Sequence, residues 1–328
     1  MRSGRILSIL LPFAILCGLT IGLFLPSVAE SLGSLIDLLV LSLLFLLFFE
    51  IRLDPIREAS RRRGFLFLAW VSNFILIPFL GWGIASILFG SQPALFAGLL
   101  LYFLFPCTDW FLAFTRIAKG DVILGSILIP INLVSQLLFF PVYLTLFIGS
   151  QTNFDLFQTW DVLVQWFLLP LLLALLVRFL LSRALTIVRF ESLLTLVGGT
   201  VPWVLAALVC CIFCSNTPKL ILYYTSFPLI LVGVLMFFVF TWILSKLLTW
   251  RFRIGRQQHV LLVMTTAARN SPLMLGLATI ALPDQPLVYA TLIIGMLVEF
   301  PHLTLLSRLL LPKENLITSS RSNPVATP

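Results

Sequence analysis

Apolar runs separated by short polar segments follow one another along the whole chain. Each run is about 20 residues long, the length of helix that crosses a hydrocarbon core of about 30 Å. The pattern therefore predicts an all-α polytopic membrane protein. We expect ten transmembrane segments, at about 6–26, 31–51, 65–90, 94–118, 121–149, 159–181, 194–214, 221–248, 258–283 and 286–311.

The two ends of the chain are interpreted from their polarity and from the length of the first apolar run. The only long polar segment, residues 313–328, predicts a disordered cytoplasmic tail. The first apolar run lies between MRSGR and PSVAES, a context that resembles a cleavable signal peptide. Because this run is longer than the usual signal core, we interpret it as the first transmembrane segment.

Composition supports the same class, since the chain of 328 residues is 60% hydrophobic and only 10% charged. Soluble domains are about 25% charged. The positive-inside rule predicts that both termini are cytoplasmic, in a bacterial-type plasma membrane. With this orientation, only Lys219 among the cations outside the spans falls on the outer side, and Arg269 is the only cation near the middle of a span. The net charge of +8 is then explained by membrane insertion, so it does not indicate a nucleic-acid partner.

An internal repeat divides the segments into two sets of five. LLP recurs at Leu10–Pro12 and Leu168–Pro170, and LLFFP at Leu137–Pro141 matches LVEFP at Leu297–Pro301. The shared offset predicts inverted repeats over residues 1–150 and 151–312, as in many secondary transporters.

The fourth and ninth segments are interrupted by polar residues at matching places. Pro106, Cys107, Thr108 and Asp109 break one segment, and Arg269, Asn270, Ser271 and Pro272 break the other. A pair of interrupted segments in corresponding positions indicates the binding site of a secondary transporter. We expect Ser271 to cap the helix after the second break and two half-helix N-termini to meet around a polar cavity.

Arg269 is costly within a membrane and should therefore face the protein interior beside a partner. The candidate partners are Asp109 and Glu299. Two roles remain open: a structural pin between the crossing segments, or direct participation in substrate binding or ion coupling.

Other polar and thiol side chains complete the candidate site. Cys107 at the first break is either a packing residue or a thiol activated by a helix N-terminus and a guanidinium. Asn132, Ser135 and Gln136 share one face of the fifth segment. Cys210 and Cys214 are interpreted as packing residues, and the sequence indicates no metal site and no cofactor.

The two blocks FPCTDWFLAFTRIAKGDVILGSILIPINLVSQLLFFP and TTAARNSPLMLGLATIALPDQPLVYATLIIGMLVEFPHLT resemble the bile acid/sodium symporter superfamily, and within it the arsenical-resistance permease branch. The matching residues are Cys107, Gly120, Asp121, Asn132 and Glu299. The resemblance implies a core domain of segments three to five and eight to ten that moves against a panel of segments one, two, six and seven.

Two positions depart from that branch. Leu133 stands where arsenite permeases have aspartate, and Arg269 stands where they have a neutral polar residue. Sodium-coupled members bind cations beside the ninth-segment break, where a fixed guanidinium would repel sodium and stand in for it. The departures therefore favour proton coupling, with Asp109 or Glu299 as the titrating acid and Gln136 nearby.

Three functions follow from these observations. The first is a proton-coupled antiporter that exports arsenite-like oxyacids. The second is a sodium- or proton-coupled permease for a small organic anion. The third, a membrane receptor or intramembrane enzyme, lacks any supporting catalytic motif. For the two transporter functions, the expected substrate-binding residues are Cys107, Thr108, Asn132, Arg269, Asn270 and Ser271, and the expected coupling residues are Asp109, Gln136 and Glu299.

Overall fold

A computed structural model describes residues 2–50, 62–108, 110–149 and 168–311. Within these ranges every regular element is helical, and the only β-type pairing is one isolated bridge. The N-terminal part contains α1 (Arg2–Phe24), α2 (Pro26–Gly33), α3 (Ile36–Phe49), α4 (Arg63–Val71), a π-helical turn (Ser72–Leu76), α5 (Ile77–Phe89), α6 (Pro93–Leu104), α7 (Trp110–Ile117), α8 (Val122–Tyr143) and a second π-helical turn (Leu144–Ile148). The C-terminal part contains α10 (Leu169–Ala184), α11 (Ile187–Leu222), a 3-10 turn (Tyr224–Ser226), α12 (Phe227–Phe252), α13 (Arg256–Ala267), α14 (Ser271–Ala281) and α15 (Pro286–Leu309).

Several helices have the length and apolarity of membrane spans. Five continuous helical stretches qualify: Arg63–Phe89, Val122–Phe147, Ile187–Pro218, Tyr224–Phe252 and Pro286–Leu309. The pair α2 and α3 qualifies jointly despite a bend of 44°. The all-helical membrane fold is thus confirmed, whereas the number of ten spans and the inverted repeat stay predictions. The sixth predicted span lies partly outside the described residues, and the predicted C-terminal tail lies wholly outside them.

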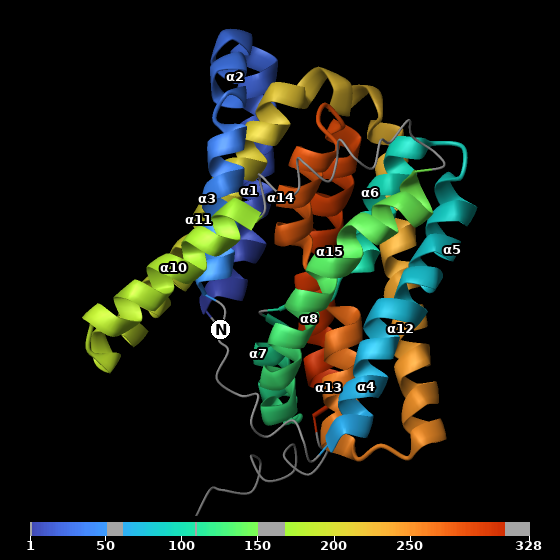
Figure 1. Cartoon of the computed structure of the whole chain (residues 1–328). Coiled ribbons are helices and arrows are strands. Elements are labelled where there is room, and N and C mark those ends of the chain that lie inside the picture. The colour runs from blue at the N-terminus through green and yellow to red at the C-terminus, as the bar shows by residue number, and fades with distance from the viewer. Residues whose placement is uncertain (1, 51–61, 109, 150–167, 312–328) are drawn as a thin grey trace, which may run out of the picture.

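The helices form two groups in Figure 1. We call α1, α2, α3, α10 and α11 the panel bundle, because their most extensive contacts are with one another. We call α4 to α8 and α12 to α15 the core bundle for the same reason, and α14 and α15 also contact the panel bundle. This grouping agrees with the core and panel that the family resemblance implies.

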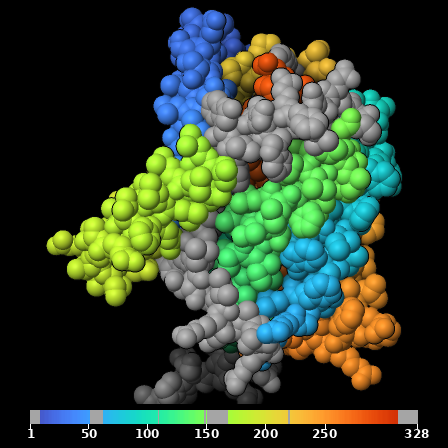
Figure 2. Space-filling view, in the orientation of Figure 1, coloured from blue at the N-terminus to red at the C-terminus, as the bar shows by residue number. Residues whose placement is uncertain are grey.

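The outward faces of the helices are apolar. Figure 2 shows α10 and the start of α11 projecting from the rest of the molecule. Along α10, five leucines are at least half exposed: Leu169, Leu172, Leu173, Leu176 and Leu180. In water such a surface would favour aggregation, but hydrocarbon solvates it without cost.

Close contact between α1 and α11 depends on a Gly-x-x-x-Gly pair. A Cβ atom on Gly18 would lie 2.5 Å from the carbonyl oxygen of Cys210, and one on Gly22 would lie 2.0 Å from the Thr217 hydroxyl. Small residues at this spacing allow two membrane helices to approach backbone to backbone. Cys210 and Cys214 lie on the α11 side of this contact.

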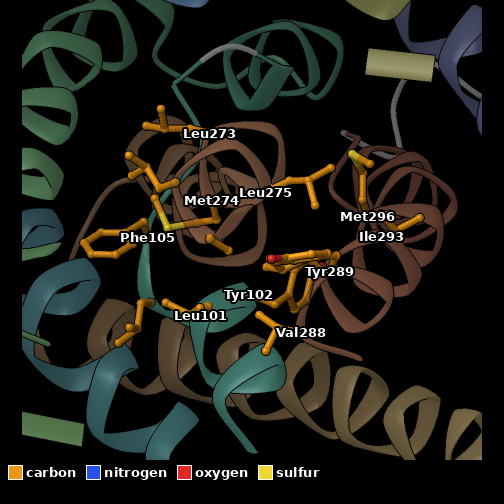
Figure 3. Close-up of a cluster of buried hydrophobic side chains, with 14 of the residues drawn as sticks. Leu101, Tyr102, Phe105, Leu273, Met274, Leu275, Val288, Tyr289, Ile293 and Met296 are labelled. Atoms are coloured by element: carbon orange, nitrogen blue, oxygen red, sulfur yellow. The ribbon is translucent and has the colours of Figure 1, made fainter. Parts of the chain in front are cut away.

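The core bundle is centred on helices that lie far apart in the sequence. Figure 3 shows Leu101, Tyr102 and Phe105 together with Leu273, Met274 and Leu275 from α14 and four residues from α15. All six named side chains are buried. This packing holds the end of α6 against α14 and α15, and it therefore positions the two helix breaks.

We predict that Gly22→Ala destabilises the protein, because the new methyl group would overlap Thr217 and the carbonyl of Cys214. Overpacking of this kind costs about 1–3 kcal/mol. The measurement is the melting temperature of the detergent-purified protein. Gly199→Ala in α11 is the control, since nothing lies within 4 Å of the added atom; equal melting temperatures for the two variants would contradict the packing argument.

Candidate functional site

The two predicted helix breaks meet in the structure. The segment between α6 and α7 pairs with the segment between α13 and α14 through an antiparallel bridge from Pro106 to Arg269. The amide of Cys107 donates to the carbonyl of Ala268 at 3.0 Å, and the amide of Asn270 donates to the carbonyl of Phe105 at 3.0 Å. Pro106 fits the bridge although it has no N–H, because its neighbours make both hydrogen bonds.

The break after α13 begins where two backbone amides leave the helix. The amide of Arg269 donates to Glu299 Oε1 at 3.1 Å, and the amide of Asn270 donates across the bridge. In a continuous helix these amides would bond to the carbonyls of Thr265 and Thr266. Both threonines are fully buried, so their carbonyls need other donors.

The guanidinium of Arg269 supplies those donors. Nη2 donates to the carbonyl of Thr265 at 2.7 Å and to the carbonyl of Thr266 at 2.8 Å. Nη1 donates to the carbonyl of Phe103 at 3.2 Å, in the last turn of α6. The guanidinium thus joins the C-terminal ends of two half-helices, where its charge complements the negative ends of both helix dipoles.

Aromatic packing and burial hold the guanidinium in place. Arg269 has no exposed surface, and its guanidinium carbon lies 5.6 Å from the centre of the Phe237 ring. The Phe237 ring stacks in turn on the ring of Phe103, with 4.2 Å between centroids. A cation over an aromatic face is stabilised further when it is desolvated.

Asn73 is a member of the site that the sequence analysis missed. Its Oδ1 accepts a hydrogen bond from Arg269 Nη2 at 3.2 Å, and its Nδ2 donates to Thr265 Oγ1 at 3.0 Å. Asn73 lies in the π-helical turn between α4 and α5, a feature common at functional sites. The one signal in the sequence was a single amide residue in an otherwise apolar run, which costs energy unless it has a partner.

Glu299 contacts Arg269 in a way that differs from the expected ion pair. Its carboxylate accepts from the Arg269 amide through Oε1 and from the Tyr102 hydroxyl through Oε2 at 3.3 Å. No salt bridge joins this carboxylate to the guanidinium, which bonds only to uncharged oxygens among the described residues. The physical reason is the helix break. It frees the Arg269 amide, which bonds to the Glu299 carboxylate, and it frees carbonyls at the end of α13, which bond to the guanidinium. Asp109, the other expected partner, lies outside the described residues.

A second polar cluster lies next to the bridge, and hydrogen bonds join three of its residues, all of them predicted site residues. Asn270 Nδ2 donates to Gln136 Oε1 at 3.1 Å and to Thr108 Oγ1 at 3.4 Å. The structure therefore brings together residues from the first break, the second break and α8. Asn132 is also fully buried, one helical turn before Gln136. We call Thr108, Asn132, Gln136 and Asn270 the amide cluster.

Polar atoms of the amide cluster remain without partners. Neither amide atom of Asn132 nor Gln136 Nε2 makes a hydrogen bond with the part of the chain that the structure describes. Such atoms are rare in protein interiors and usually mark a place for water, an ion or a ligand.

The structure contradicts the expected role of Ser271 at the second break and does not test the chemical role of Cys107 at the first. Ser271 does not cap α14, because Asn270 occupies the N-cap position and makes no side-chain capping bond. Ser271 is already the first helical residue, where its hydroxyl no longer reaches the helix amides as an N-cap side chain does. Cys107 is buried at the first break and packs in an apolar cluster with residues that include Phe111, so its chemical role stays a prediction.

The two histidines lie apart from these clusters. His259 Nδ1 is 2.6 Å from Thr249 Oγ1, and the His302 ring stacks on Phe238. Across residues 2–50, 62–108, 110–149 and 168–311, no three His, Cys, Asp or Glu side chains gather as a metal site requires.

Two broken helices that cross in an apolar helical bundle, with orphaned polar groups beside the crossing, define the class as a secondary membrane transporter. Residues 37–219 match the family model described as the Sodium Bile acid symporter family. This match covers more than half of the chain, so the chain belongs to that family and is a membrane transporter and not an enzyme. A relative from Bacillus subtilis (strain 168), "Uncharacterized protein YbaS", is 25% identical over an alignment of 242 residues that covers 71% of this chain and 74% of that protein.

We predict that Glu299→Leu destabilises the protein strongly, because it leaves the Arg269 amide and the Tyr102 hydroxyl without their acceptor. Leaving a buried donor without its acceptor costs about 1–3 kcal/mol for each group. Glu299→Gln keeps an acceptor of the same shape and should cost less. The measurements are the melting temperature and the monodispersity of the purified protein. Glu30→Leu is the control, because Glu30 is exposed. A Glu299→Leu variant as stable as the wild type would show that the carboxylate does not hold the crossing together.

Proposed function

We propose that this protein is a secondary active transporter for a small organic anion. The observation that supports this function is the pair of unpartnered donors in the amide cluster, Asn132 Nδ2 and Gln136 Nε2. Both are fully or almost fully buried, so a substrate that supplied acceptors would recover the free energy lost in their desolvation.

Electrostatics beside the cluster favour a negative charge. The helices α7 and α14 begin directly after the two breaks, and each N-terminus carries about half a positive charge. Their first amides have no intrahelical acceptor. A carboxylate placed between these ends would accept hydrogen bonds from backbone and side-chain donors together, which is the arrangement that half-helices use for anionic substrates.

We propose that the residue responsible for ion coupling lies at the second break, beside Arg269. Glu299 is the only carboxylate in contact with the crossing among the described residues, and it bonds directly to the second break. We propose that protonation and deprotonation of Glu299 couple proton movement to the rearrangement of that break. Asp109 remains a second candidate acid from the sequence, and Gln136 links this function to the substrate through Asn270.

The second candidate function is export of a trivalent metalloid oxyacid such as arsenite. Cys107 favours it, because its thiol belongs to the first break, one residue from Thr108 of the amide cluster. A soft trivalent metalloid would bind the thiol, whereas a carboxylate would not use it.

We also propose that the chain lies in a bacterial-type plasma membrane with both termini in the cytoplasm. The strong inward bias of Lys and Arg supports this orientation.

A thermal-shift screen of the purified protein tests the substrate class. We expect small mono- or dicarboxylates to raise its melting temperature, and radiolabelled uptake by proteoliposomes would then identify the transported species. Asn270→Ala and Gln136→Leu should weaken binding about tenfold to a hundredfold, because each removes a hydrogen bond to a charged ligand worth about 1.5–3 kcal/mol.

Asn216→Ala is the matched control, since that amide lies in α11 and bonds to its own helix. Arsenite is included as a probe. Stabilisation by arsenite alone, lost in Cys107→Ser, would replace the first proposal by the second. Binding of carboxylates that Asn270→Ala and Gln136→Leu leave unchanged would place the substrate elsewhere.

Reporter fusions test the orientation. Alkaline phosphatase fused after Gly149 follows five predicted spans and should be active in the periplasm, whereas the same enzyme fused after Pro328 should be inactive. Activity at the C-terminal position would overturn the assignment.

A further inference from the structure

Four oxygen atoms surround the guanidinium of Arg269 and are uncharged. They are the carbonyl oxygens of Phe103, Thr265 and Thr266 and the side-chain oxygen Asn73 Oδ1, at 2.7 to 3.2 Å from the guanidinium nitrogens. We call these four atoms the oxygen cage. All four residues and Arg269 itself are fully buried.

The oxygen cage has a negative potential of its own. Phe103 lies in the last turn of α6, and Thr265 and Thr266 lie in the last turn of α13. Each helix C-terminus carries about half a negative charge, and the Glu299 carboxyl group lies beside Arg269. Without the guanidinium, these oxygens would point into a dry interior with no donor, which buried acceptors do not tolerate.

This ligand chemistry is that of a monovalent hard-cation site. Carbonyl and amide oxygens at half-helix C-termini are the groups with which transporters coordinate Na⁺. The oxygen cage has this composition, but its occupant is a side chain of the same chain. The guanidinium differs from a bound ion in that it cannot dissociate.

We propose that Arg269 is a covalently attached substitute for a bound sodium ion, and that the oxygen cage becomes a sodium site when the guanidinium is removed. This inference deepens the proposed transport function, because it assigns the ion that this crossing does not use. A merely structural role for Arg269 is the competing hypothesis. That role predicts that every truncation is destabilising, with no preference among added cations.

The experiment measures melting temperatures of detergent-purified protein in NaCl, KCl and choline chloride at equal ionic strength. The wild type should show no sodium-specific shift. Arg269→Ala and Arg269→Gln should melt lower in choline chloride and regain at least about 2 °C in NaCl, with the midpoint of the titration giving the sodium affinity. Arg269→Lys retains a tethered charge and should remain insensitive to sodium.

Matched variants locate the effect at the oxygen cage. Adding Asn73→Leu to Arg269→Ala removes one of the four oxygens and should abolish the sodium response or weaken it at least about tenfold. The same addition of Asn216→Ala in α11 should leave the response unchanged. Folded Arg269→Ala without a sodium-specific shift would overturn the proposal, and so would a sodium response in Arg269→Lys equal to that of Arg269→Ala.

If the Arg269→Ala and Arg269→Gln variants cannot be purified in folded form, the wild-type protein still tests the proposal. A sodium-specific stabilisation of the wild type that Asn73→Leu removes would show that sodium already uses the oxygen cage beside Arg269, and would overturn the proposal. A wild type without a sodium response supports it. None of these measurements needs the transported molecule, so failure here is distinguishable from failure to find an organic-anion substrate.

Discussion

The crossing of the two helix breaks depends on one constraint: backbone groups released inside a membrane protein must find partners without help from water. Arg269 meets this constraint twice. Its amide leaves α13 and bonds to Glu299, while its guanidinium returns to the carbonyls of Thr265 and Thr266. The residue that interrupts the helix therefore also satisfies the end it creates. This double role makes a buried arginine, which is costly in isolation, tolerable at this place.

The bridge separates two electrostatic environments. The helix C-termini and the oxygen cage lie with Arg269, whereas the helix N-termini lead to α7 and α14 beside Asn270. A cation and an anion are thus favoured at different ends of the same short pairing between breaks. Because Arg269 and Asn270 are consecutive, movement of one side of the bridge must move the other. In the proposed function, this covalent link is the physical route that couples the acid Glu299 to a substrate held by the amide cluster.

Sequence reasoning located the breaks but not the hydrogen bonds that stabilise them. Pro106 and Pro272, with the polar residues around them, were sufficient to predict both interruptions, because a continuous apolar helix rarely tolerates proline and charge together at its centre. Glu299 was likewise predicted as a partner of Arg269. The sequence did not predict that the Arg269 backbone amide bonds to Glu299 while its guanidinium bonds to backbone carbonyls. A local sequence pattern does not show which amide leaves a helix. Asn73 was missed for a related reason: its partners lie in α13 and in the break that follows it, far along the chain.

The placement of Arg269 also bears on the source of transport energy. Its contacts come from Phe103, Asn73, Phe237, Glu299 and α13, all within the core bundle. In the movement that the family resemblance implies, this bundle moves against the panel bundle and carries the guanidinium with it. A dissociating sodium ion would cross in one direction and draw about 2.3 kcal/mol from each 100 mV of membrane potential. A guanidinium attached to the chain returns with the empty carrier, so it moves no net charge across the membrane over a full cycle. The proposed function therefore assigns the driving force to a proton, because the Glu299 carboxyl group contacts the same break.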